Sequence, residues 1–168
     1  MLSAIIDRHA KEIDEAKKAE ELKELIQPGN PGVRELAKKC PTPKAAYEFV
    51  RDRIMEVHPK VSASYWLDVD DIMRLGAADL DDKSIFLCSM LRAMGENAWV
   101  AMLEMKNGYR RAVVLTDDHV LDADDIRKYD DFAGLSQEEA LGKYRFDGFP
   151  VKRLLFKFNE REYVAPKH

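Results

Sequence analysis

Apolar residues recur with the period of an α-helix through the first third of the chain. The pattern predicts a highly charged helix over residues 2–26. Two further helices each begin at a capping residue followed by proline, at Asn30-Pro31 and at Thr42-Pro43. The second of these has the clearest apolar stripe, which consists of Ala46, Phe49, Val50, Ile54 and Val57.

A short helix and then a long one are predicted in the middle of the chain. Asp68 can cap the short helix, which ends at Gly76, and Asp79 can cap the long helix, which ends at Gly95. Apolar and small residues line one face of the long helix: Leu80, Ser84, Leu87, Cys88, Leu91 and Met94. We therefore expect this helix to be central and buried.

The period changes to that of β-strands after the long helix. The pattern predicts strands over 99–105 and 110–115, joined by a tight turn at Asn107-Gly108, and a short third strand over 119–122. The remaining predicted elements are one helix and two strands, at residues 136–142, 153–158 and 163–164.

The order of these elements predicts an α+β fold, in which N-terminal helices and a central buried helix pack on an antiparallel sheet. A length of 168 residues suits a single domain over residues 1–168. Within it we expect a core over about 30–125, with the helix over 2–26 before it and a helix and strand extension over 126–168 after it.

Composition and charge argue against several classes of protein. The net charge is −4, and lysine and arginine are mixed with acidic residues, so nucleic acid is not expected as a partner. No apolar run could span a bilayer, so no membrane is expected. Two cysteines, Cys40 and Cys88, are too few for a disulfide framework, which favours reduced thiols in the cytoplasm. The histidines form no metal pair by spacing, and no metal or cofactor is predicted.

Three short segments of the sequence are informative through their order and spacing. The first is Asp79-Leu80-Asp81-Asp82-Lys83-Ser84 at the start of the long helix, the second is Arg111-Ala112-Val113-Val114, and the third is Val120-Leu121-Asp122. In order and separation these segments resemble the transglutaminase-like superfamily, which has a papain-like fold and a Cys-His-Asp triad. The resemblance implies that Leu80 occupies the cysteine position, Arg111 the histidine position and Asp122 the aspartate position.

These replacements remove the chemistry of the family. Leu80 has no nucleophilic atom, so covalent acyl transfer through this position is excluded. Arg111 stays protonated and cannot act as a general base. The sequence thus predicts a protein without a catalytic cysteine and histidine, in which Arg111 and Asp122 form a salt bridge on one face of the sheet.

The leading functional hypothesis is a non-catalytic binding or regulatory domain. Its former cleft would accept a peptide, a protein segment or a small acidic ligand through Tyr65, Trp66, Asp79, Asp81, Arg111 and Asp122. One alternative is a hydrolase or transferase that uses Cys40, Cys88 or the aspartate cluster. Another is a structural interaction domain that self-associates through the helix over 2–26.

Overall fold

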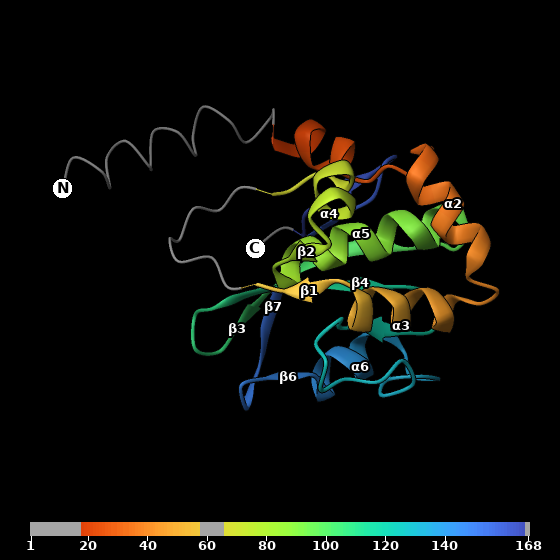
Figure 1. Ribbon diagram of the computed structural model, residues 1–168. Coiled ribbons are helices and arrows are strands. Elements are labelled where there is room, and N and C mark those ends of the chain that lie inside the picture. Colours follow the sequence, from red (N-terminus) through yellow and green to blue (C-terminus); the bar gives the residue numbers. More distant parts are fainter. Residues whose placement is uncertain (1–17, 58–65, 167–168) are drawn as a thin grey trace.

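The computed structural model describes residues 18–57 and 66–166 (Figure 1). Residues 18–25 are helical, and the rest of the helix predicted over 2–26 lies largely outside the described residues. The other helices are α2 (Pro31–Lys39), α3 (Pro43–Arg53), α4 (Val69–Leu75), α5 (Leu80–Ala93) and α6 (Gln137–Lys143).

The helices begin where their capping side chains predict. The side chains of Asn30, Thr42, Asp68, Asp79 and Ser136 each accept a hydrogen bond from a backbone N–H in the first turn of the helix that follows. These bonds satisfy donors that have no partner inside the helix. The predicted helix starts are therefore confirmed.

The main sheet is antiparallel, with the strand order β5-β4-β3-β7-β6 and with β8 paired to β7. The strands predicted over 99–105 and 110–115 are found at those bounds, and the third is shortened to two residues. The bounds are β3 (Trp99–Met105), β4 (Arg110–Leu115), β5 (Val120–Leu121), β6 (Arg145–Phe146), β7 (Phe149–Phe158) and β8 (Tyr163–Val164).

The sheet has a hydrophobic core on each face. Val100 and Met102 of β3 face α5, whereas Ala101, Leu103 and Met105 belong to a second cluster that includes Tyr144 after α6. This alternation follows from the two-residue repeat of a strand. Figure 1 shows α5 along one face of the sheet, with α2 and α4 beyond it, and α6 on the opposite side. The predicted α+β fold with a buried central helix is confirmed.

The prediction that the stripe of the third helix includes Val57 was wrong. The helix α3 ends at Arg53, and the next residues form β1 (Met55–Glu56), which pairs in parallel with β2 (Ala77–Ala78). The N–H groups of Met55 and Val57 donate to backbone oxygens of Gly76 and Ala78, at 2.9 and 3.0 Å. Val57 is 41% exposed, because this pairing turns the chain out of the helix. The partner strand lies about twenty residues away, so local periodicity could not indicate it.

The C-terminal part of the chain is integral to the sheet. The strand β7 starts at Phe149, four residues before the predicted start, and pairs with β3 in the middle of the sheet. Two register shifts interrupt this pairing, which explains why the alternation of β7 is clear only near its end. Among the described residues, none of the helices has the length and apolar character needed to cross a membrane.

Candidate functional site at the first turn of α5

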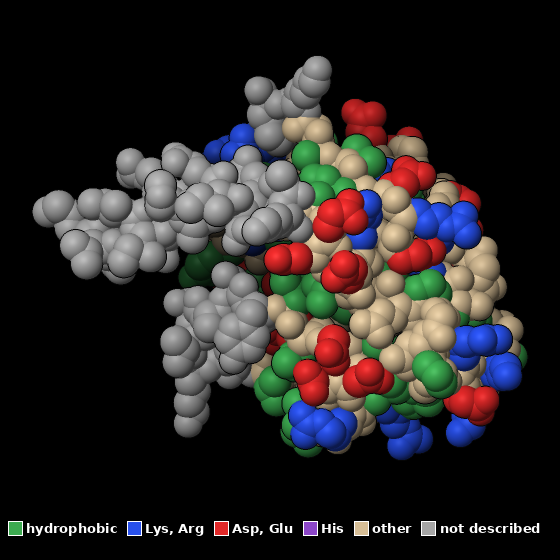
Figure 2. Space-filling view, turned by 90° about the horizontal axis from the view of Figure 1, so that it is seen from above, with side chains coloured by type: hydrophobic (Ala, Val, Ile, Leu, Met, Phe, Trp, Pro, Cys, Tyr) green, Lys and Arg blue, Asp and Glu red, His purple; other side chains and the backbone are tan. Residues whose placement is uncertain are grey.

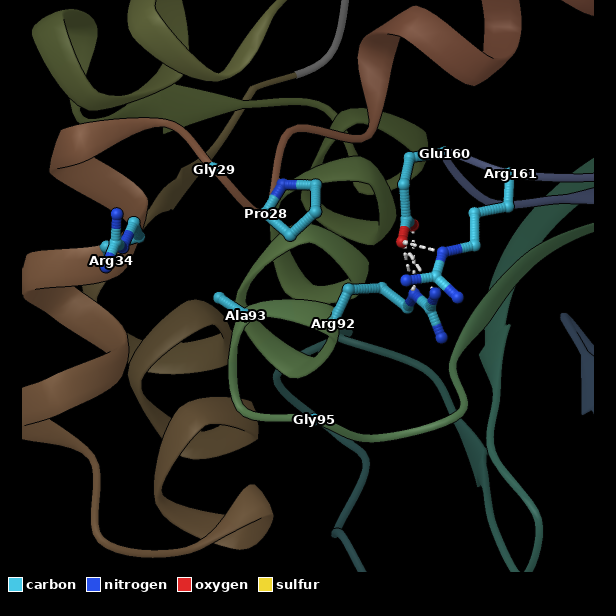
Figure 3. Close-up of a pocket in the computed structure, with 8 residues that line it drawn as sticks. All are labelled: Pro28, Gly29, Arg34, Arg92, Ala93, Gly95, Glu160 and Arg161. Atoms are coloured by element: carbon cyan, nitrogen blue, oxygen red, sulfur yellow. Dashed lines mark hydrogen bonds and ion pairs between the residues drawn. The ribbon is translucent and has the colours of Figure 1, made fainter.

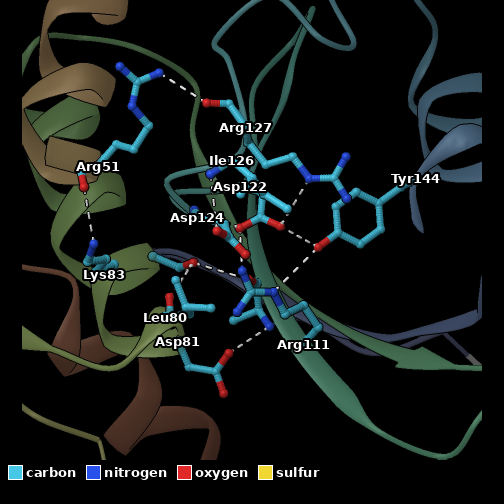
Figure 4. Close-up of polar contacts among 12 residues, drawn as sticks. Arg51, Leu80, Asp81, Lys83, Arg111, Asp122, Asp124, Ile126, Arg127 and Tyr144 are labelled. Atoms are coloured by element: carbon cyan, nitrogen blue, oxygen red, sulfur yellow. Dashed lines mark hydrogen bonds and ion pairs between the residues drawn. The ribbon is translucent and has the colours of Figure 1, made fainter. Parts of the chain in front are cut away.

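The first turn of α5 lies beside β4 and the end of β5. Leu80 and Asp81 are the first two residues of the helix, after the capping Asp79. The N–H of Ala112 donates to Asp81 Oδ1 at 2.9 Å, which joins β4 to the helix start. Figure 4 shows Leu80 and Asp81 close to Arg111 of β4. The three segments that carry the family resemblance therefore meet at one place.

A buried ion pair between Arg111 and Asp122 lies where the three segments meet. The Arg111 guanidinium donates to Asp122 Oδ1, and the two residues are each 3% exposed. The Tyr144 hydroxyl donates to Asp122 Oδ2 at 2.6 Å, and Arg111 Nε lies 3.4 Å from the same hydroxyl oxygen. The predicted salt bridge between Arg111 and Asp122 is confirmed, and the side chains lie on the same face of the sheet.

Side chains from distant segments cover the ion pair. The ring of Phe146 lies 4.6 Å from the Arg111 guanidinium carbon. The Nε atom of Arg127 lies 4.0 Å from Asp122 Oδ2, and its guanidinium stacks on the ring of Tyr144 at 5.3 Å. On the α3 side, the hydroxyl of Tyr47 donates to the backbone oxygen of Asp122 at 2.6 Å. The pair is thus enclosed by α3, the segment after β5, the residue after α6 and β6.

The protonation states of Arg111 and Tyr144 are those expected of a structural hydrogen-bond network. Burial alone would lower the pKa of Arg111, but Asp122 and Tyr144 raise it above its ordinary value, so the guanidinium stays charged. Burial and the Asp122 charge raise the pKa of Tyr144, so its hydroxyl stays a neutral donor. Neither group can exchange a proton near neutral pH.

The other polar residues at the start of α5 tie the helix to its neighbours. Asp82 Oδ1 accepts from the N–H of Leu67 at 3.0 Å, and the Ser84 hydroxyl donates to the backbone oxygen of Ala112 at 3.2 Å. The Lys83 ammonium donates to the backbone oxygen of Arg51 at 3.2 Å. Burial raises the pKa of Asp82 to about 7. These side chains anchor α5 against α3, β4 and the segment before α4.

The six residues predicted to bind a ligand are only partly brought together. Asp81, Arg111 and Asp122 converge, and Asp79 caps α5 beside them. Trp66 is partly buried, packs edge-on against Phe158 at 6.3 Å and lies against the core. Tyr65 lies outside the described residues.

Sequence reasoning missed Tyr144 and Arg127, which complete the network around Asp122. Tyr144 ends α6, at a position where an aromatic residue is expected to pack in the core. Arg127 lies in the polar connection between β5 and α6. Neither has a local feature that indicates contact with Asp122, because the contacts depend on how the segment between β5 and α6, which carries Arg127, and the residue after α6 fold back over the sheet.

The two cysteines are packed, not activated. Cys88 is fully buried and Cys40 is half-buried against the core, and burial raises the pKa of both thiols. We expect iodoacetamide to label Cys40 slowly at neutral pH and Cys88 only after denaturation, since the thiolate is the reactive species. Mass spectrometry of the labelled peptides measures this, and rapid labelling of native Cys88 would contradict the assignment.

Metal ligands do not converge in the part of the chain that the structure describes, where no group of three His, Cys, Asp or Glu side chains could hold an ion. His119 instead contacts Asp118, with its Nδ1 atom 2.7 Å from a carboxylate oxygen. It also packs against the ring of Tyr129 at 4.2 Å.

A pocket of about 480 Å³ lies at the other end of α5 (Figure 3). Its wall includes Arg92 and Glu160, whose side chains are hydrogen-bonded at 2.6–3.0 Å. Arg34 and Arg161 also line the pocket, and Arg161 Nε lies 3.8 Å from Glu160 Oε1. The pocket is remote from Leu80 and its central charges are paired with each other, so it is separate from the site at the first turn of α5.

Comparison with known proteins gives a family and a fold. The family model of the CEP76 peptidase-like domain matches residues 64–163. EGTA-treated LapG of Legionella pneumophila is 14% identical with a TM-score of 0.52, over 88% of this chain and 74% of LapG. Calcium-bound LapG of the same organism has the same identity and TM-score, over 86% of this chain and 74% of its own. No curated protein matches the sequence. The matches support a transglutaminase-like, papain-like fold.

Proposed function

Because the chain belongs to the CEP76 peptidase-like domain family, we propose that it is a non-catalytic member that binds a partner instead of cleaving or transferring acyl groups. The observation that carries the proposal is the buried network of Arg111, Asp122 and Tyr144 beside Leu80. A triad in this fold needs an ionisable nucleophile and a proton acceptor at these positions, and neither is present.

The position of Leu80 supports the loss of covalent chemistry. The start of a helix presents unpaired N–H groups and a partial positive charge, which would favour a cysteine thiolate. A leucine side chain has no ionisable atom that this partial positive charge could stabilise. The scaffold of the nucleophile segment is kept, since Asp79 caps the helix and Asp81 binds β4, whereas the reactive atom is missing.

The enclosure of Arg111 and Asp122 supports a binding role away from these two residues. Each is 3% exposed, and their charges are paired with each other. Phe146 of β6 covers the Arg111 guanidinium and Arg127 lies beside Asp122, so a ligand would reach this pair only if these two side chains moved away. Recognition of an acidic ligand by Arg111 in a former cleft is therefore less well supported than an interaction through another surface.

The rival reading, an enzyme with a relocated nucleophile, has little support. Cys88 is inaccessible, and the pKa of the Cys40 thiol is raised by burial. Lys83 is 2% exposed, so its amine is out of reach of a substrate although burial lowers its pKa. The accessible groups near Leu80 are carboxylates, which serve as caps and backbone acceptors.

The proposal predicts that the protein has no thiol-dependent turnover. Incubation under reducing conditions with fluorescent casein, and separately with a glutamine donor and a labelled amine, should give the same signal as buffer. Turnover that iodoacetamide abolishes would overturn the proposal. A matched variant, Leu80→Cys, tests the scaffold: its new thiol should react with iodoacetamide faster than Cys40, because the helix start favours the thiolate.

A further inference from the structure

Two hairpin ends lie together at one end of the main sheet. The turn between β3 and β4 and the turn between β6 and β7 both project there, away from α2 (Figure 1). The N–H of Lys106 donates to the backbone oxygen of Pro150 at 2.9 Å, which joins the two hairpins. Met105 connects them further, because it pairs with Val151 and its N–H donates to the backbone oxygen of Tyr109 at 2.8 Å.

Two large aromatic side chains are exposed at this end. Tyr109 is 62% exposed and Phe149 is 42% exposed. Both follow tight turns, one at Asn107-Gly108 and one at Asp147-Gly148, where the backbone of Gly108, Asp147 and Gly148 has positive φ. The turns hold these aromatic residues at the rim of the sheet. Exposed aromatic residues grouped in this way are typical of protein interfaces.

The same end is rich in cations. Residues 104–110 and 145–153 contain five cationic side chains, namely Lys106, Arg110, Arg145, Lys152 and Arg153, against the two anions Glu104 and Asp147. The chain as a whole has the opposite sign, with a net charge of −4. On the face over α2 and α4, Asp and Glu side chains are spread across the surface, with Lys and Arg side chains among them and along its edge (Figure 2). We call Tyr109, Phe149 and the five cations the hairpin-end surface.

Part of this positive charge is not neutralised inside the domain. Glu104 contacts two of the cations, Lys152 at 3.3 Å and Arg153 at 2.8 Å. The side chains of Lys106 and Arg110 make no ion pair or hydrogen bond among the described residues. Arg110 lies opposite Glu104 in the strand register of β3 and β4, so it extends the cationic cluster onto β4.

We propose that the hairpin-end surface docks an acidic peptide segment of a partner protein, an inference that rests on the proposed interaction role. Tyr109 and Phe149 would pack against apolar side chains of the segment, and the unpaired cations would bind its carboxylates. Cationic and aromatic side chains together favour an acidic, partly apolar ligand over a purely charged one. The surface is distinct from the enclosed Arg111–Asp122 pair, so binding needs no opening of that network.

The test uses a fluorescein-labelled peptide of repeated Glu-Glu-Leu units and fluorescence anisotropy on the full chain. The variants are Tyr109→Ser/Phe149→Ser and Lys106→Ser/Arg110→Ser, and the matched control is Arg34→Ser/Arg161→Ser at the remote pocket. All of these side chains are accessible, so the folded state should persist, which thermal unfolding checks. We expect each hairpin variant to weaken binding about tenfold or more, and the control to stay within about twofold. Added salt should weaken binding to the wild-type chain.

Other outcomes would overturn the inference. Failure of the wild-type chain to bind the peptide would do so, as would equal binding by the hairpin variants. The surface would be assigned to nucleic acid if a poly-uridine oligonucleotide bound more tightly than the peptide and the same variants abolished its binding. None of these outcomes tests catalysis, so failure of this inference is distinguishable from the thiol-dependent turnover that would overturn the proposed function.

Discussion

Replacing Asp122 with asparagine is expected to lower the free energy of unfolding by about 3–5 kcal/mol. The variant keeps the size of the side chain and one oxygen acceptor, but leaves the Arg111 guanidinium charged, 3% exposed and without its counter-ion. A buried cation that has lost its partner bears the full cost of desolvation. Urea unfolding at neutral pH, followed by circular dichroism, measures the change.

A second variant separates the charge from the packing. In Arg111→Met/Asp122→Asn neither charge remains, and the asparagine oxygen can still accept from Tyr144. We expect this double variant to recover roughly half or more of the stability lost in Asp122→Asn. As a control, Glu35→Gln removes an ion pair with Lys38 in which both side chains are more than two-thirds exposed, and should cost less than about 0.5 kcal/mol. A loss below about 1 kcal/mol in Asp122→Asn would show that the ion pair is not desolvated.

Replacing Asp82 with asparagine is expected to stabilise the protein above pH 7 and to have little effect below about pH 4. Burial, with Asp79 and Asp81 nearby, raises the pKa of Asp82 from 3.8 to about 7 in the folded chain. The folded state therefore favours the protonated form. The contribution of Asp82 to stability is fully present below the unfolded pKa and is lost as pH rises through about 7. The difference amounts to roughly 2–4 kcal/mol.

The measurement is the stability of both proteins across this pH range. The difference between variant and wild type should grow from about pH 4 and level off above about pH 7. Carboxylates that titrate alike in both proteins contribute equally to the two stabilities, so their contributions cancel in the difference. Asparagine can still accept from the N–H of Leu67, so the contact with the segment before α4 is kept. As a matched control, Asp125→Asn makes the same substitution at an exposed carboxylate, and its stability is measured over the same pH range. A flat difference would mean that Asp82 titrates near its ordinary pKa.

The pattern along the chain predicted the parts of the fold that depend on neighbours in sequence. The capping residues Asn30, Asp68 and Asp79 indicated helix starts because each bond spans only two or three residues. The Asn107-Gly108 turn indicated the β3–β4 hairpin for the same reason. The small parallel pair of β1 with β2, and the early start of β7, could not be predicted in this way, because their hydrogen bonds join distant segments.

The order of three segments also predicted that the start of α5, β4 and the end of β5 meet, and it placed Arg111 and Asp122 on one face of the sheet. These inferences need only strand alternation and the succession of elements. The sequence by itself thus determined the fold class and the salt bridge between Arg111 and Asp122. The tertiary structure alone decided that this salt bridge is enclosed by Tyr144, Phe146 and Arg127, and that Tyr109 and Phe149 share an exposed cationic end of the sheet. Burial and electrostatic surroundings are set by which distant segments pack together, and a linear pattern of residues does not contain that information.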